Sequence, residues 1–236
     1  MPSVKDPRAL SFPAGNRILS AIPEEEYGRI LPHLTPVRLP RGKVLWDGGD
    51  VIRDAYFVAG GMLSLLSTTG EGSTIEVGMI GSEGLAGIAA VLGFEVAPYG
   101  VVVQIPAPAL RVKVDALRRE FARGGRLQLL LLRYTHALLT QVSQSASCNR
   151  FHTVEERLCR WLLISRDRAA SDTLPLTQEF LSQMMGVPRT SVSAVAIQLQ
   201  KEGLISYSRG VIRIITAADL RAAPASATRS SPQASS

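Results

Sequence analysis

The chain has 236 residues, of which 46% are hydrophobic and 19% are charged. This composition is typical of a globular protein with one large or two ordinary domains, and it excludes a wholly disordered chain. The net charge of +6 favours a polyanionic partner, and the excess is largest after residue 148, where 11 basic and 7 acidic residues occur.

Cysteine usage and the apolar runs indicate where the protein works. Its two cysteines, Cys148 and Cys159, are too few to hold a fold of this size together. The longest apolar run, 127–139, contains Arg133 and His136 and is too short to cross a bilayer. No apolar signal segment follows the first methionine. We therefore expect a protein of the reducing cytoplasm with no membrane partner.

The first half of the chain is predicted to form a β-roll. Residues 1–15 contain prolines and charges and are expected to be a flexible arm, and residues 16–34 a short helical lead-in. From residue 35 to residue 114, short apolar segments alternate with turn residues, which indicates an all-β sandwich or barrel-like roll. The expected strands are Leu45–Trp46, Ala55–Val58, Met62–Leu66, Thr74–Met79, Val101–Ile105 and Ala109–Val114.

A basic helical segment at 115–123 leads into a long helix, which we predict at 124–149 as a dimerisation helix. Apolar residues in it alternate by four and three positions, the period of a coiled-coil seam. The alternative is that this leucine-rich face packs on the β-roll of its own subunit, and both arrangements can hold together. The predicted seam residues are Leu127, Leu131, Tyr134 and Leu138.

Residues 149–152 are expected to form a hinge before a helix at 154–169. Thr153 and Glu156 have the spacing of a capping box at the start of that helix. Cys148 and His152 have the i, i+4 spacing of metal ligands. An ordinary buried thiol and a histidine in a hinge explain the pair better, so we predict no metal site.

The segment 176–203 has the pattern of helix, tight turn and helix. Thr177 is a good N-cap for the first helix, which Gly186 and Pro188 end after about nine residues. The second helix, from Arg189 to about residue 202, has apolar residues at i, i+3, i+4 and i+7. Two helices joined by three residues with a glycine in the turn are typical of a unit whose second helix enters the DNA major groove.

The polar side of the second helix carries the candidate base-reading residues. Arg189, Thr190 and Ser193 gather at its start, and an arginine can bond guanine O6 and N7 together. Strands at 204–207 and 211–215 follow as a wing, with Arg209 at its tip. The alternative is that the hydroxyl groups only cap and solvate a small helical bundle.

A β-roll, a long helix, a hinge and a winged helix-turn-helix, in this order, resemble the Crp/Fnr family of bacterial transcription regulators. The resemblance covers about residues 16 to 220. It is carried by Pro40-Arg41-Gly42, Gly49-Asp50, Ala55-Tyr56-Phe57-Val58, Leu176 to Leu181, Gly186 to Ser193 and Gly203-Leu204-Ile205.

The resemblance implies a homodimer that binds a two-fold symmetric operator in double-stranded DNA, with RNA polymerase as a candidate further partner. Arg189, Thr190 and Ser193 would then face bases in each half-site. The residues expected at DNA phosphates are Thr177, Gln178, Ser191 and Arg209.

The effector region departs from the family pattern. Members that bind cyclic AMP carry Gly-Glu-Leu followed by an arginine that pairs with the cyclic phosphate, but here no arginine or lysine occurs between Arg53 and Arg111. A buried phosphate without a cation is costly, so we expect no cyclic nucleotide binding of the usual kind, although an anion nest of backbone N–H groups can partly compensate. The candidate effector residues are Gly81, Ser82, Glu83, Gly84, Leu85, Gly87 and Tyr99.

No effector or cofactor can be identified from the sequence. Iron–sulfur members of the family use N-terminal cysteines, and this chain has none before Cys148. Neither a Ser/His/Asp set nor a carboxylate pair can be argued, so we predict no catalytic residue and no enzyme.

The sequence thus predicts an α+β protein with five parts. They are the arm at 1–15, a sensor β-roll of the cyclic-nucleotide-binding type at 16–123, the dimerisation helix at 124–149, a winged helix-turn-helix at 150–220 and a disordered tail at 221–236. The alternative function is a ligand- or protein-binding β-roll whose helical C-terminal part serves assembly and not DNA binding.

Overall fold

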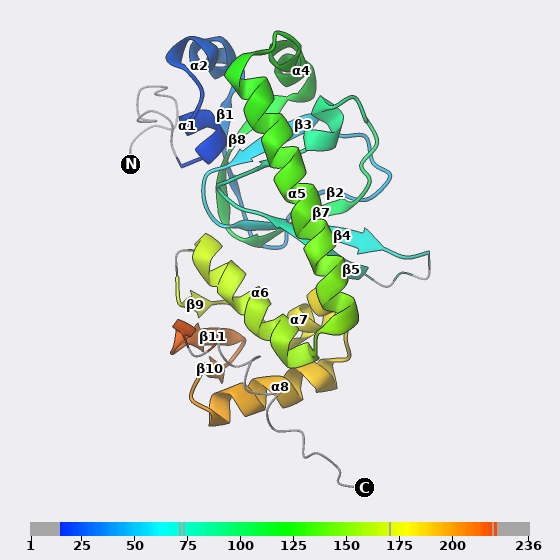
Figure 1. Ribbon diagram of the computed structural model, residues 1–236, viewed down its shortest axis with the longest axis vertical. Coiled ribbons are helices and arrows are strands. Elements are labelled where there is room, and N and C mark those ends of the chain that lie inside the picture. Colours follow the sequence, from blue (N-terminus) through cyan, green and yellow to red (C-terminus); the bar gives the residue numbers. More distant parts are fainter. Residues whose placement is uncertain (1–14, 71, 73, 170, 219, 221–236) are drawn as a thin grey trace, which may run out of the picture. The chain divides into compact units, whose positions relative to one another are not determined.

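The structure, a computed structural model, describes residues 15–70, 72, 74–169, 171–218 and 220. It divides into two units (Figure 1). The first unit consists of Met1–Thr68 and Val77–Val142, and the second of Thr69–Glu76 and Ser143–Ser236. The predicted disordered tail and all but the last residue of the predicted arm lie outside the described residues.

The first unit begins with short helices and continues as a roll of two antiparallel sheets. One sheet has the strand order β1-β8-β3-β6 and the other β2-β7-β4-β5. The elements from the start of the described chain to Phe151, of which β5 and α5 belong in part to the second unit, are α1 (Arg17–Ser20), α2 (Glu24–Ile30), the 3-10 turn η2 (Leu31–His33), β1 (Thr35–Leu39), β2 (Val44–Trp46), β3 (Asp54–Val58), β4 (Met62–Thr68), β5 (Thr74–Ile80), β6 (Leu85–Ala86), α3 (Ile88–Val91), β7 (Gly100–Ile105), β8 (Ala107–Lys113), α4 (Val114–Ala122) and α5 (Gly125–Phe151).

The core of the first unit lies between the sheets and under the helices that cover them. Phe57 on β3 and Leu65 on β4 are fully buried, and Leu19 of α1 and Leu117 of α4 are buried in the same cluster. Asn16 fixes the start of α1, because its side chain accepts hydrogen bonds from the N–H groups of Ile18 and Leu19. The mixed helical and antiparallel architecture predicted from the sequence is therefore confirmed.

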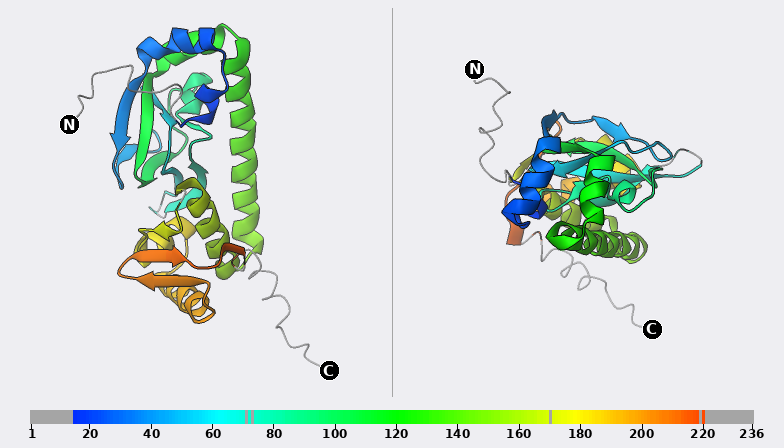
Figure 2. Two further views of the ribbon diagram at one scale, coloured as in Figure 1. Left: turned by 90° about the vertical axis from the view of Figure 1, so that its left-hand side faces the viewer. Right: turned by 90° about the horizontal axis from the view of Figure 1, so that it is seen from above.

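Helix α5 lies alongside the roll, as the left view of Figure 2 shows. Leu127 and Leu131 are fully buried in the core of the first unit, and Tyr134 is 8% exposed in the same cluster, with Leu138 packed against it. One turn further along, Gln141 Oε1 accepts a 2.8 Å hydrogen bond from the backbone N–H of Met79. Leu127 and Leu131 have no surface left for a second chain, whereas Leu138 and Gln141 are half-buried. The packing on the roll of the same subunit, which the sequence left open beside the dimer seam, is therefore present in the structure, and the dimer itself stays a prediction.

The predicted hinge is shorter than expected. Helix α5 continues through Asn149 and Arg150 to Phe151, and the N–H of His152 still donates to the carbonyl of Cys148 at 3.0 Å. None of these residues breaks a helix, so the helix ends only where Thr153 begins the next one.

Among its described residues, the second unit contains the end of α5, three further helices and a small three-stranded sheet of order β10-β11-β9. Its core is apolar: Leu162 on the first of these three helices and Leu199 on the last are fully buried. The segment Thr69–Glu76 belongs to this unit, where the indole N–H of Trp161 donates to Glu76 Oε1 at 2.8 Å. The elements after α5 are α6 (Val154–Ala169), β9 (Thr173–Leu174), α7 (Gln178–Met185), α8 (Arg189–Lys201), β10 (Ile205–Ser208) and β11 (Val211–Ile214).

The start of α6 is a capping box, as its sequence predicts. The backbone N–H of Thr153 donates to Glu156 Oε2 at 2.7 Å, and the N–H of Glu156 donates to Thr153 Oγ1 at 3.3 Å. The hydrogen bond from the backbone of Thr153 holds the pKa of Glu156 below its usual value. The ionised carboxylate therefore caps the helix at neutral pH.

Candidate nucleic-acid interface

The helix-turn-helix is formed by α7, the turn 186–188 and α8. Thr177 Oγ1 accepts a 3.2 Å hydrogen bond from the N–H of Phe180, which caps α7 as predicted. Gly186 ends α7 in the left-handed region, with φ +60°, where a side chain would be strained. Pro188 then stands at the N-cap of α8. The turn is therefore set by local sequence.

A hydrogen-bond network joins α7, α8 and β10. Ser193 Oγ donates to Gln178 Oε1 at 2.7 Å, and the backbone N–H of Gln178 donates to Tyr207 Oη at 3.1 Å. The N–H of Tyr207 donates in turn to Gln200 Oε1 at 2.8 Å. Three elements are thereby held in one orientation. The sequence analysis missed Tyr207 and Gln200, since nothing in the local pattern pairs a strand tyrosine with a helix N-terminus.

The exposed face of α8 begins with Arg189 and Thr190, both exposed, whereas Ser191 and Ser193 are half-buried. The opposite side of α8 is in the core of the unit. Within the described part of the chain, no side-chain hydrogen bond caps the N-terminus of α8, and the exposed Arg189 and Thr190 stand at this positive end of the helix dipole. A helix end of this kind suits a phosphate group.

Further residues share that exposed face and were missed. Ala194, Ile197 and Lys201 are exposed and follow Thr190 at intervals of four, three and four residues. With 3.6 residues per turn, this spacing keeps them on the side of Thr190. The helical spacing of these residues is visible in the sequence, but only residues near the start of the helix were predicted to contact DNA. We call Arg189, Thr190, Ser193, Ala194, Ile197 and Lys201 the reading face.

The wing carries Arg209 at its tip, as predicted. Strands β10 and β11 pair from Ile205 with Ile214 to Ser208 with Val211, which leaves a two-residue turn. Both residues of this turn have positive φ, +48° at Arg209 and +76° at Gly210, as the tight turn of a hairpin requires. Arg209 is exposed. The hairpin lies beside α8 in the left view of Figure 2.

Helix α6 is bonded to the first helix of the helix-turn-helix. The guanidinium of Arg157 donates to the carbonyl of Met185, the last residue of α7. Burial lowers the pKa of Arg157, and it raises the pKa of the Cys159 thiol, two residues further along α6, to about 12. Cys159 is therefore a protonated core residue at neutral pH. Among the described residues there is no group of three or more His, Cys, Asp or Glu side chains that could hold a metal ion.

The candidate effector segment of the first unit is bonded to its own chain. Glu83 Oε1 accepts a 3.0 Å hydrogen bond from the N–H of Gly81, and the carbonyl of Gly84 accepts one of 2.8 Å from Asn16 Nδ2. The carbonyl of Ser82 accepts another of 2.8 Å from the N–H of Arg17. These hydrogen bonds hold the main chain of the segment at Gly81, Ser82 and Gly84.

On its core side, the same segment packs against buried residues of the first unit. Leu85 is fully buried in the core, and Gly87 is buried beside Ala55. Gly84 lies so close to the ring of Tyr134 that an added Cβ would stand 2.6 Å from Cε2. Tyr99 is half-buried, and burial raises its pKa.

Two family models match the chain, one in each half. The model for a cyclic nucleotide-binding domain matches residues 36–123, and the model for a Crp-like helix-turn-helix domain matches residues 156–223. No curated protein sequence matches the chain. No helix in the described part of the chain is long and apolar enough to cross a membrane.

Solved structures with the same fold are regulators of low sequence identity. The c-di-GMP-responsive global regulator CLP of Xanthomonas campestris is 17% identical, with a TM-score of 0.68 over 82% of this chain and 100% of that chain. A Crp/Fnr-family regulator from Eubacterium rectale is 14% identical, with a TM-score of 0.69 over 86% and 95%. FixK2 from Bradyrhizobium japonicum is 15% identical, with a TM-score of 0.68 over 79% and 95%.

These likenesses show the fold, and the two family models add the identity of both domains in the order that the sequence predicts. The chain is a member of the Crp/Fnr family of transcriptional regulators.

Proposed function

We propose that the protein is a dimeric, sequence-specific DNA-binding regulator that reads a two-fold symmetric operator with α8. The observation that carries the proposal is the reading face, which is exposed and polar at its start, on a helix whose other side is held in the core. Arg189 suits a guanine edge, and the uncapped N-terminus of α8 suits a phosphate. The exposed Arg209 on the wing suits a second phosphate contact.

The internal hydrogen bonds refine the roles of the other predicted contacts. The hydroxyl of Ser193 already donates to Gln178, so its remaining capacity toward a base is as an acceptor. Thr177 already accepts the capping bond of α7, and the main-chain N–H of Gln178 is taken by Tyr207. We therefore assign the main share of base reading to Arg189 and Thr190.

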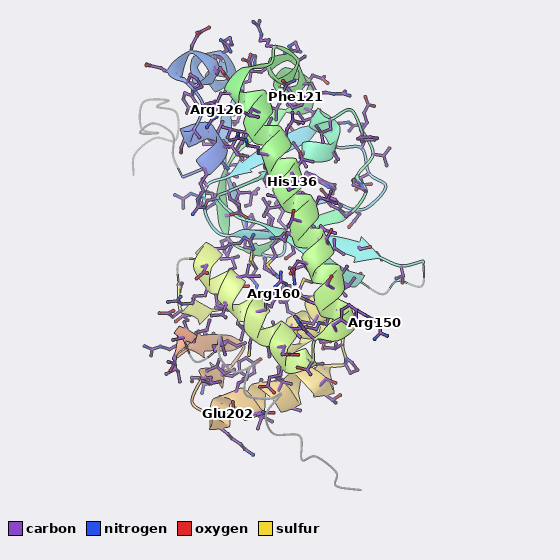
Figure 3. The ribbon with its side chains drawn as sticks, viewed as in Figure 1. Phe121, Arg126, His136, Arg150, Arg160 and Glu202 are labelled. Atoms are coloured by element: carbon purple, nitrogen blue, oxygen red, sulfur yellow. The ribbon has the colours of Figure 1, made fainter. Side chains whose placement is uncertain are left out.

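We infer that the second copy docks on the outward side of α5. Leu129, Leu132 and Leu139 are 40%, 47% and 64% exposed, although each is a large apolar side chain. With His136 between them they alternate by three and four residues, the period of a paired-helix seam. His136 lies near the middle of α5 (Figure 3). We propose this strip in place of the seam predicted from the sequence, because Leu127 and Leu131 of that seam fill the core.

We infer further that the roll takes no cyclic nucleotide in the usual way. The backbone N–H of Gly81, one of the groups that an anion nest in this loop would use, already donates to the carboxylate of Glu83. The segment also lacks the arginine that would compensate a buried phosphate. Calorimetry with cyclic AMP and with cyclic GMP should therefore give no saturable heat at micromolar ligand, and tight binding would refute this part.

DNA reading is tested by Arg189→Ala. We expect a loss of about 1–3 kcal/mol per half-site in binding to a selected operator, with much less effect on random duplex DNA. The matched control is Arg126→Ala, which removes the same charge from an exposed arginine on α5 (Figure 3) and should leave operator binding unchanged. Equal operator affinity of Arg189→Ala and the wild type would contradict the assignment.

The salt dependence of DNA binding distinguishes the regulator from the alternative, a β-roll module whose helical C-terminal part serves assembly. If several phosphates are contacted, binding to random duplex DNA should weaken steeply as salt rises. A weak and flat salt dependence would favour the module.

The seam is tested by Leu139→Glu, with Ala137→Glu as the control. Both add one negative charge to an exposed position of α5, but only Leu139 belongs to the apolar strip. Sedimentation should give a monomer for Leu139→Glu and a dimer for Ala137→Glu. A dimer in both variants would contradict this seam.

A further inference from the structure

The reading face contains an aliphatic side chain at its centre. Ile197 is 55% exposed, and its neighbour on that face, Ala194, is exposed as well. Ile197 follows Ser193 by four residues and precedes Lys201 by four, so polar side chains flank it along the helix. It lies two turns beyond Arg189, about 12 Å along the axis.

Neither packing nor helix formation explains this isoleucine. The core side of α8 is already supplied by Val192, Ala196 and Leu199, all buried. β-branched residues are also weaker helix formers than the straight-chain polar residues that usually occupy exposed positions. A single exposed apolar side chain is common on protein surfaces. Here, however, it occupies the middle of the surface assigned to DNA.

The major groove offers one apolar group at the base edges, the C5-methyl group of thymine. An aliphatic side chain cannot hydrogen-bond to a base, so in the groove it gains free energy only by covering such a methyl group and is penalised over an unsatisfied polar edge. The chemistry of Ile197 thus matches thymine and no other base.

We propose that Ile197, with Ala194 beside it, is a specificity-determining residue that reads the methyl group of a thymine in each operator half-site. The inference rests on the proposed function and adds to it a second base identity. Arg189 reads a guanine by hydrogen bonds at the start of α8, and Ile197 reads a thymine by apolar contact two turns further on.

The test removes the methyl group alone. Each thymine of an operator selected by the wild-type chain is replaced in turn by uracil, symmetrically in both half-sites, and affinities are measured by fluorescence anisotropy. At one symmetric pair of positions the loss should be about four-fold per half-site, or about 15-fold for the two together, the effect of covering one methyl group in each.

The same uracil scan is repeated with Ile197→Ser and with Ile215→Ser. Ile215 is a matched control because it is 58% exposed in the same unit but lies beyond the wing and not on α8. The methyl dependence should disappear in Ile197→Ser and persist in Ile215→Ser. Both positions are exposed, so both variants should fold like the wild type.

The outcomes separate the inference from the proposed function. An operator that is bound in an Arg189-dependent way but shows no uracil effect would overturn the inference and leave the proposed function intact. A uracil effect that survives in Ile197→Ser would also overturn it, since another residue would then read the methyl group. Failure of the wild-type chain to select any operator would overturn both.

Discussion

Gly84 of the candidate effector segment packs closely against Tyr134 on α5, and its substitution tests that packing directly. An added Cβ would stand 2.6 Å from Cε2 and 2.7 Å from Oη of Tyr134, and 2.8 Å from Cγ2 of Ile80. These distances are well inside van der Waals contact, and the ring of Tyr134 is itself buried in the core. Gly84→Ala should therefore destabilise the first unit by about 1–3 kcal/mol, the usual cost of overpacking.

The assay is urea unfolding followed by tryptophan fluorescence. The chain has two tryptophans, Trp46 in the first unit and Trp161 in the second, so Trp161→Phe leaves a probe of the first unit alone. Gly28→Ala is the matched control: nothing lies within 4 Å of an added Cβ in the interior of α2, and replacing glycine there should stabilise by up to about 1 kcal/mol.

The physical cause is checked in a second background. When Tyr134→Leu removes the ring, Gly84→Ala should cost at least about 0.5 kcal/mol less than in the wild type, because the two sites are in contact. An equal cost in both backgrounds, or no cost in the wild type, would refute the close packing of this segment on α5.

Three further changes test the second unit, each by urea unfolding with Trp161 as the probe in chains that lack Trp46. Thr153→Ala removes the cap of α6 and should cost about 0.5–2 kcal/mol, and wild-type stability would contradict the capping box. Gly186→Ala forces a left-handed backbone on a residue with a Cβ and should cost about 1–2 kcal/mol, and a neutral result would contradict the turn geometry. The buried Cys159 thiol keeps its proton to a pKa of about 12, whereas the unfolded thiol ionises near 8.5–9, so between these values stability should fall as pH rises, by up to about 1.4 kcal/mol per pH unit. Cys159→Ala should show a shallower decline over pH 9–10.5, and an identical slope would contradict the burial of the thiol.

Local signals account for the parts of the fold that could be predicted. The bounds of α6, α7 and α8 agree with prediction to within one residue, because Thr153, Thr177, Gly186 and Pro188 fix helix ends through their own backbone and side-chain chemistry. The strands of the roll were found from their apolar runs, apart from β1 and β6. The two-residue strands β6 and β9 were missed, because two residues cannot show an alternation.

Contacts between residues far apart in the sequence could not be predicted in the same way. Helix α5 has two apolar strips, one through Leu127 and Leu131 and one through Leu129 and Leu132, and both have the spacing of a seam. Only the position of the roll decides which strip is buried. Likewise Asn16 donates to the carbonyl of Gly84, 68 residues away, a contact that no local pattern indicates.

The most exposed residues of the candidate site were predicted from the sequence, and the hydrogen bonds that hold the site together were not. Arg189, Thr190 and Arg209 are exposed as expected of DNA contacts. The internal partners of Gln178 and Ser193 depend on how α7, α8 and β10 pack, which the sequence does not specify residue by residue.

In the proposed function, two copies of α8 read one operator with two-fold symmetry. Its most direct test is to select duplexes from a random pool with the full chain and to sequence the bound fraction. We expect an inverted repeat whose half-site centres lie about 10–10.5 base pairs apart, one turn of the duplex. Enrichment of a single unrepeated site, or of no motif at all, would contradict it.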